Sequence, residues 1–128
     1  MSRGLILFAH GARDPRWAEP FEAIAARARS LQPTLDVRLA FLELMTPTLA
    51  DAGAAMAAAG LAQIDIVPLF LGTGGHVRQD LPVLLKTLRT AHPAVQWRLH
   101  RAIGEQPEVI AAIALAATTL FRDNESAP

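Results

Sequence analysis

Two histidines and two carboxylates are the residues of this sequence best suited to chemistry, because each follows a predicted strand. They are His10, Glu43, His76 and Glu105. Imidazole binds first-row divalent metals such as cobalt, nickel and iron, and near neutral pH it can also accept a proton. Two nitrogen ligands leave coordination positions open, which suits the transfer of a metal more than its storage. The remaining histidines differ, since His92 precedes a proline and His100 lies within a predicted strand.

Each of these side chains also has an ordinary structural explanation. His10 could bond to nearby backbone at its strand end, and His76 could cap the helix that follows it. Glu43 interrupts an apolar strand end, where a carboxylate needs a partner or a role, and it could instead cap the helix that begins near Pro47. Glu105 is best explained as a solvated acid in a first helical turn. The chemical interpretation therefore rests mainly on the two histidines coming together.

Arginines and glycines flank the histidines. Arg13, Arg16 and Arg78 are each typical surface residues, but together at one rim they could hold an anionic ligand through charge-assisted hydrogen bonds. The turn that contains Gly74 and Gly75 could serve as a phosphate cradle at a helix start. That reading is weak, because the turn lacks the Lys-Ser/Thr pair of a P-loop and follows the third predicted strand instead of the first.

Alternating apolar runs and helical stripes predict four strand–helix units. The strands are expected at residues 4–9, 37–42, 64–71 and 95–102, and the helices at 15–31, 48–59, 77–90 and 107–121. This pattern predicts a parallel sheet with helices on both faces, and right-handed crossovers make 2-1-3-4 the simplest strand order. We therefore expect one α/β domain, a three-layer α/β/α sandwich over residues 1–121, followed by a frayed tail at 122–128.

Prolines and glycines mark the ends of the predicted helices. Asp14-Pro15 and Thr46-Pro47 both have the pattern of an N-cap followed by proline in the first helical turn. Gly60 is expected to end the second helix. Pro20 lies inside the first predicted helix, where it should kink the helix or delay its start.

The composition excludes several functional classes. A chain of 128 residues that is 52% hydrophobic can form one domain with a proper core. Twelve basic residues balance twelve acidic ones, which argues against a general binder of nucleic acid or membrane surfaces. Without cysteine, any metal needs nitrogen or oxygen ligands. With no targeting or membrane-spanning segment in the sequence, we expect a cytoplasmic protein.

Three motifs resemble those of the CbiX-type sirohydrochlorin chelatases. The segment His10-Gly11-Ala12-Arg13-Asp14 resembles the family's His-Gly-Ser/Ala-Arg-Asp motif, and Phe41-Leu42-Glu43 with Pro47 downstream resembles its second motif. The third resemblance is the most specific, and it consists of Pro68-Leu69-Phe70-Leu71, Gly75-His76-Val77 and Asp80-Leu81-Pro82. Order and spacing agree over roughly residues 4–110.

The resemblance implies insertion of a divalent metal into sirohydrochlorin, on a route to cobalamin, siroheme or a nickel tetrapyrrole. Co²⁺ is the first expectation, with Fe²⁺ and Ni²⁺ as alternatives, and the metal is a substrate, so no organic cofactor is expected. The family's metal-binding histidines correspond to His10 and His76, and its acidic position corresponds to Glu43. The residues expected to bind the tetrapyrrole are Arg13, Gly74, Gly75 and Arg78.

The resemblance also bears on assembly. Larger relatives carry two such domains with the tetrapyrrole held between them, so a chain of this size is implied to form a homodimer that rebuilds the cleft. The fourth loop departs from the family, because Gln106 stands where histidine or aspartate is frequent. Two other functions stay open: a metal chaperone or sensor of the same fold, and a phosphate- or nucleotide-binding flavodoxin-like module.

Overall fold

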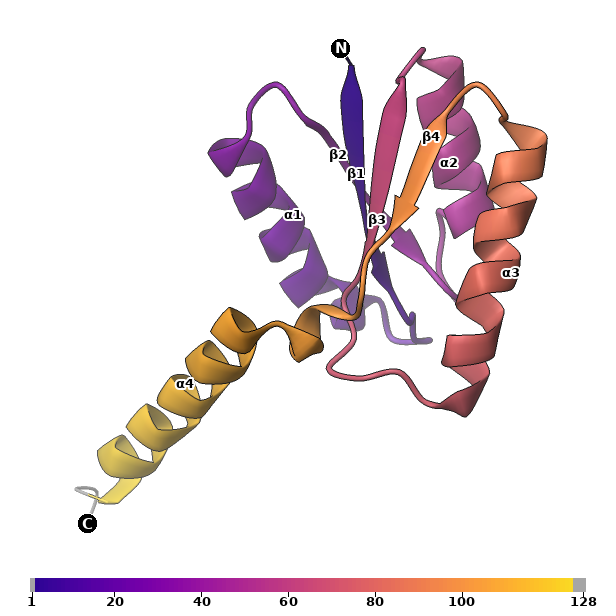
Figure 1. Cartoon of the computed structure of the whole chain (residues 1–128). Coiled ribbons are helices and arrows are strands. Elements are labelled where there is room, and N and C mark those ends of the chain that lie inside the picture. The colour runs from indigo at the N-terminus through magenta and orange to yellow at the C-terminus, as the bar shows by residue number, and fades with distance from the viewer. Residues whose placement is uncertain (1, 126–128) are drawn as a thin grey trace.

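The computed structural model describes residues 2–125 and contains one four-stranded parallel sheet (Figure 1). Its strands are β1 (Arg3–Ala9), β2 (Asp36–Phe41), β3 (Gln63–Pro68) and β4 (Gln96–Leu99). They lie in the order β2-β1-β3-β4, and every neighbouring pair is parallel. The predicted strand order 2-1-3-4 is therefore confirmed.

The last two strands end earlier than predicted. β3 stops at Pro68, which has no backbone N–H to continue a ladder, and residues 69–71 turn away into a loop. β4 is an edge strand with a single neighbour, and it ends at Leu99, opposite Ile66 of β3. Both changes lengthen the loops that lie beyond the carboxyl edge of the sheet.

The helices form layers on both sides of the sheet. The helical elements are η1 (Pro15–Ala18), α1 (Glu19–Leu31), α2 (Leu49–Ala58), α3 (Gly75–Ala91), η2 (Ile103–Glu105) and α4 (Pro107–Glu125). Helix α1 covers one face, while α2 and α3 cover the other (Figure 1). The strand order accounts for this arrangement. The chain moves from β1 outward to β2 and then in the opposite direction to β3 and β4, and right-handed crossovers in opposite directions place their helices on opposite faces.

The starts of α1 and α2 test the predicted caps. Asp14 accepts the Arg16 backbone N–H as predicted, but Pro15 opens only the 3₁₀ turn η1. Helix α1 begins at Glu19 with Pro20 in its first turn, so the predicted delay is confirmed.

The second predicted cap is wrong. The cap of α2 is Thr48, whose hydroxyl accepts the Asp51 N–H at 3.1 Å. Thr46-Pro47, a cis peptide, lies before the helix instead of opening it. Gly60 follows the end of α2 with φ +85°, as expected for a helix-ending glycine.

The main core lies between the sheet and the α2–α3 layer. Its fully buried side chains include Ile6, Phe8, Met56 and Ile64. The side-chain atoms of Trp97 and Leu88 approach Gly53 of α2 so closely that a Cβ there would lie 2.7 Å from Leu88. This packing fixes the sheet and positions the loops at its carboxyl edge.

The layer on the α1 side is less complete. Its buried centre is formed by Leu7, Ala25 and Val37. Helix α4 leaves the body of the protein, and within residues 2–125 η2 is the one element with which it shares more than marginal contacts (Figure 1). Because α4 runs through Glu125, the frayed tail predicted from residue 122 is wrong for 122–125, and 126–128 lie outside the described residues.

None of the helices described is long and apolar enough to cross a membrane. The predicted domain limit at residue 121 stays a prediction.

Candidate functional site

The residues singled out for chemistry lie beyond the carboxyl ends of the strands. His10 directly follows β1, Glu43 lies two residues after β2, His76 is in the first turn of α3, and Glu105 ends η2. All four are exposed to solvent. Parallel strands present their carboxyl ends at one edge, so this edge is where the fold offers a ligand site.

His10 is held by stacking. Its ring centroid lies 4.2 Å from that of Phe70, with the planes inclined by 31°. Phe70 is buried, so it provides a fixed surface beneath the imidazole. Within residues 2–125 the ring nitrogens of His10 make no hydrogen bond, which leaves them able to bind a metal or a proton.

The loops after β1 and β2 are joined through their backbones. The Leu42 N–H donates to the Ala9 carbonyl at 2.8 Å, and the Glu43 N–H donates to the His10 carbonyl at 2.9 Å. Gly11 has φ +105°, and a Cβ at this position would lie 1.8 Å from the Glu43 carbonyl oxygen. Glycine is thus required where the two loops meet.

The loops after β3 and β4 are joined in a similar way. The Gly104 N–H donates to the Phe70 carbonyl at 2.9 Å, and a Cβ on Gly104 would lie 2.1 Å from the Leu71 carbonyl oxygen. Phe70 therefore connects three loops, through its ring to His10 and through its carbonyl to Gly104. Sequence reasoning missed this role, although Phe70 stands inside the third motif.

His76 is the second residue of α3, and Gly74 occupies the N-cap position. The alternative that His76 caps this helix is therefore wrong. Nothing lies within 4 Å of a Cβ built on Gly74 or on Gly75, and neither glycine has a positive φ. Packing does not require these glycines, so they leave open surface beside His76 that a ligand can approach.

The predicted arginine rim is reduced from three residues to two. Arg16 pairs with Asp14 at 2.8 Å, and this hydrogen bond lowers the pKa of the Asp14 carboxyl below its usual range. Arg13 and Arg78 are exposed, and neither forms an ion pair within the described part of the chain. These two arginines are therefore available to an anionic ligand.

Two exposed leucines lie beside the chemical residues. Leu44 follows Glu43 and is 61% exposed, and Leu71 follows Phe70 and is 72% exposed. Such side chains at a ligand edge suit a partner with a flat apolar surface. Sequence reasoning missed both, because an apolar residue beside a strand end reads as part of the core.

The described residues include no complete set of metal ligands. Among residues 2–125 there is no group of three or more histidine, aspartate or glutamate side chains placed to hold one ion. His10 and His76 can thus offer individual imidazoles at an open edge.

The two other histidines have structural partners. His92 follows α3, and its ring centroid lies 6.1 Å from that of Trp97. His100, which directly follows β4 and does not lie inside it, has Nε2 at 2.7 Å from Asp65 Oδ2. These contacts agree with leaving both histidines out of the site.

Comparison with known proteins adds independent information. Residues 4–119 match the family model described as CbiX. The sirohydrochlorin cobaltochelatase of Methanococcoides burtonii is 34% identical over 83 residues, which cover 65% of this chain and 63% of that protein. The sirohydrochlorin ferrochelatase of Bacillus subtilis is 26% identical over 88% of this chain and 43% of its own length. The matched chain thus spans less than two thirds of these curated relatives.

Solved structures have the same fold. A CbiX protein from Marinobacter aquaeolei VT8 is 32% identical, with a TM-score of 0.84 over 94% of this chain and 98% of that one. SirB from Bacillus subtilis, solved with Fe³⁺, is 23% identical, with a TM-score of 0.80 over 100% of this chain and 49% of that one. Because the family model matches most of the sequence and the solved CbiX structure has the same fold, the chain belongs to the CbiX family.

Proposed function

We propose that this protein is a sirohydrochlorin chelatase, a lyase that inserts a divalent metal ion into sirohydrochlorin. The observation that carries the proposal is the pair His10 and His76, both exposed at the ligand edge and without hydrogen-bonded partners in the described chain. Relatives named as sirohydrochlorin cobaltochelatase and ferrochelatase support the same reaction.

The residue types fit the chemistry of insertion. A divalent ion replaces two N–H protons of the macrocycle, so the site must release a cation and take up protons. Imidazole can do both near neutral pH, but not at the same instant. His10 and His76 therefore share the two roles, and the exposed Glu43 beside the His10 loop orients an imidazole or relays protons to water.

The surroundings of the histidines fit a flat polyanionic ligand. The carboxylates of sirohydrochlorin would pair with Arg13 and Arg78, two exposed arginines that form no ion pair within residues 2–125. Leu44 and Leu71 offer apolar contact to the ring, and the open glycine turn before His76 lets it approach.

The metal is proposed to be Co²⁺ first, with Fe²⁺ and Ni²⁺ as alternatives. Imidazole binds all three, so cellular supply can decide which ion is inserted. That choice sets whether the product serves cobalamin, siroheme or a nickel tetrapyrrole. We place the reaction in the cytoplasm.

The active form is proposed to be a homodimer. One chain forms one ligand edge, and SirB accommodates the whole of this chain in about half its length. A second copy would supply the opposite wall for the tetrapyrrole. The chelatase domain is proposed to span residues 1–121.

The test is an absorbance assay with purified protein, sirohydrochlorin and each divalent ion in turn, against matched reactions without protein. The proposal expects protein-dependent conversion of the tetrapyrrole spectrum with at least one ion. Binding and release of the ion without any change in that spectrum would instead identify a metal chaperone or sensor and overturn the proposal.

A further inference from the structure

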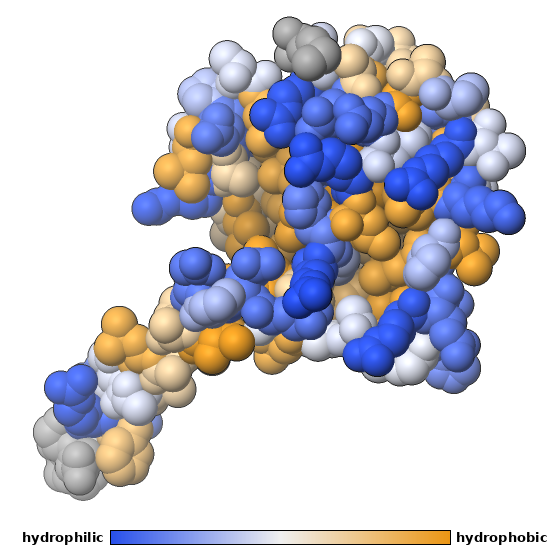
Figure 2. Space-filling view, viewed as in Figure 1, coloured by the Kyte–Doolittle hydropathy of each residue, from blue (hydrophilic) through white to orange (hydrophobic). Residues whose placement is uncertain are grey.

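Helix α4 is an amphipathic arm that the rest of residues 2–125 leaves uncovered. It extends from the body after η2, and hydrophobic residues are visible along it (Figures 1 and 2). Ile110, Ile113, Leu120 and Phe121 are between 47% and 66% exposed. An isolated helix that exposes this much apolar surface needs a partner.

These apolar residues lie on one side of α4. Helical periodicity places one stripe of residues together, and the stripe comprises Val109, Ile110, Ile113, Ala117, Leu120 and Phe121. Leu115 lies on the opposite side with Thr118 and Arg122. Leu115 and Leu120 are equally exposed, at 64% and 65%, so they form a matched pair for experiments.

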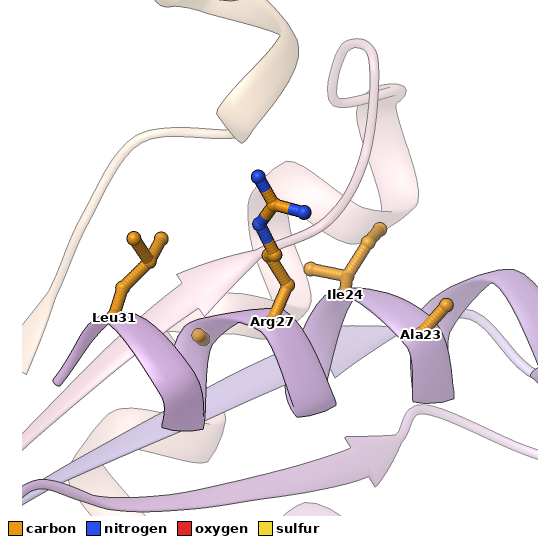
Figure 3. A pocket seen from close by; sticks show the side chains of 5 residues that line it. Ala23, Ile24, Arg27 and Leu31 are labelled. Atoms are coloured by element: carbon orange, nitrogen blue, oxygen red, sulfur yellow. The ribbon is translucent and has the colours of Figure 1, made fainter. Parts of the chain in front are cut away.

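A complementary apolar surface lies on α1. A shallow pocket of about 470 Å³ is lined by Ala23, Ile24, Arg27, Ala28 and Leu31. Ile24, Arg27 and Leu31 project from the same side of the helix (Figure 3). Ile24 is 45% exposed and Leu31 is 70% exposed, so no described segment covers this side of α1 either.

The sheet continues this surface beyond α1. Leu5 of β1, Val67 of β3 and Leu69 face the α1 layer and are only partly buried. The term α1 groove is used below for the surface formed by Leu5, Val67 and Leu69 together with Ile24 and Leu31. It occupies the part of the face that α1 does not cover.

The fold explains why α4 and the α1 groove are complementary. Helix α1 alone covers its side of the sheet, and a helix that doubles back from β4 toward β1 by a right-handed connection would lie on that side, next to α1. The helix after β4 is α4, and it turns away from that position. The exposed stripe and the exposed groove are thus both left uncovered within residues 2–125.

We propose that two copies of this chain exchange α4, so that the apolar stripe of each helix packs into the α1 groove of the other copy. The exchange is reciprocal and closes under two-fold symmetry, which covers both arms at once. This inference rests on the homodimer of the proposed function and assigns the interface between its two subunits.

A second copy fits α4 better than a membrane surface does. Interfacial membrane helices carry several lysines or arginines on the polar side, which attract anionic lipids. Residues 107–125 contain one basic residue, Arg122, and three acidic ones, Glu108, Asp123 and Glu125. Charge therefore disfavours anionic lipid, while topology supplies a matching groove in the chain itself.

The first experiment compares Leu120→Glu with Leu115→Glu by sedimentation equilibrium of the full chain. The wild type and Leu115→Glu should be dimers. Leu120→Glu should raise the dimer dissociation constant at least about 100-fold, because it places a carboxylate in an apolar contact. Both positions are exposed on α4 within one chain, so circular dichroism should show that each variant folds.

The second experiment applies the same comparison to the groove. Ile24→Glu should dissociate the dimer, whereas Ala26→Glu, exposed on the opposite side of α1, should leave it intact. Because the chain has no cysteine, Ile24→Cys and Leu120→Cys can be placed in separate chains, coexpressed and treated with a short bis-maleimide. The exchange predicts a covalent pair containing one chain of each kind.

Three results would overturn the helix exchange. They are a monomeric wild type, equal dissociation by Leu120→Glu and Leu115→Glu, and no cross-link between the two single-cysteine chains while a chain that carries both Ile24→Cys and Leu120→Cys cross-links within itself. The last would show α4 folded back on its own groove. A dimer that passes these tests but fails the absorbance assay overturns the proposed function alone, and an active enzyme that fails them overturns the exchange alone.

Discussion

At the residue scale, His10 depends on a neighbour that is distant in sequence. The motif around His10 could be recognised from the sequence, and so could its position after a strand. The stacking on Phe70 could not, because it joins residues sixty positions apart through the packing of two loops. Sequence reasoning thus identified the candidate imidazole but not the surface that orients it.

Replacing Phe70 should affect the rate of metal insertion more than the loss of core packing alone would. Phe70→Leu should lower kcat for metal insertion about tenfold by letting the imidazole move, with little change in KM. It should also cost about 1–2 kcal/mol of unfolding free energy through lost packing. Steady-state kinetics and urea unfolding measure the two effects.

Phe8→Leu is the matched control. Phe8 is buried with its ring centroid 6.0 Å from that of Phe70 and has no ring contact with His10. It should lose similar stability while keeping kcat. Equal losses of kcat in both variants would show that Phe70 acts only through the general packing of the core.

Asp65 is a second residue that the sequence left without a role. Its side chain is 16% exposed on the sheet face, near His100 and Arg98. Burial raises the pKa of Asp65, but hydrogen bonds from Gln63 and His100 and the charge of Arg98 outweigh it, so the pKa lies below its usual value. Ionised Asp65 therefore stabilises the fold.

This lowered pKa predicts a pH-dependent stability. Because the folded pKa lies below the unfolded value of 3.8, the contribution is present above about pH 4 and is lost as pH falls through the folded pKa. Asp65→Asn should cost about 1 kcal/mol at pH 7. Urea unfolding from pH 7 to pH 2.5 should show the difference from the wild type shrinking, and a constant difference would contradict the assignment.

At the element scale, the candidate site is formed by loops that are joined by backbone hydrogen bonds and close packing. Strand and helix identities followed from apolar runs and periodicity, and the early stop of β3 could have been read from Pro68. The cap at Thr48 was missed because Thr46-Pro47 offered the same signal two residues earlier. Contacts between loops, such as Gly11 on Glu43, depend on the three-dimensional approach of two strands and leave no local pattern.

Gly11 and Gly60 provide a paired test of the loop junction. Gly11→Ala should abolish most metal insertion and cost at least about 2 kcal/mol, because its Cβ would overlap the Glu43 carbonyl. Gly60 also has a positive φ, but open space surrounds the position of its Cβ. Gly60→Ala should therefore lower the free energy of unfolding by about 1 kcal/mol and leave activity intact. Thermal unfolding and the absorbance assay compare them. Full activity in Gly11→Ala would refute the role of this junction.

At the scale of the whole molecule, charge is balanced and attraction for an anion must be local. The formal net charge is zero, so long-range steering is weak, and we propose that Arg13 and Arg78 at the rim supply the attraction. The sequence predicted the strand order and the shared edge, because topology follows from the order of elements. The sequence could not predict that α4 would leave the body of the protein. A helix that packs against its own chain and a helix that packs against a second chain have the same apolar stripe.

The rim makes a quantitative prediction. Replacing both Arg13 and Arg78 with alanine should raise KM for the polyanionic tetrapyrrole about tenfold and leave kcat nearly unchanged. Added salt should raise KM in the wild type and less so in the variant. Arg16→Ala is the control, because Asp14 already neutralises Arg16. An equal effect of Arg16→Ala would show that the individual rim positions do not matter.

The central claim is that His10 and His76 together transfer the metal to the ring. The most direct test is the rate of Co²⁺ insertion by the double variant His10→Ala/His76→Ala, followed by sirohydrochlorin absorbance and compared with His92→Ala. The account predicts that the double variant stays folded and reacts no faster than the mixture without protein, while His92→Ala keeps the wild-type rate. A double variant with near-normal turnover would contradict it.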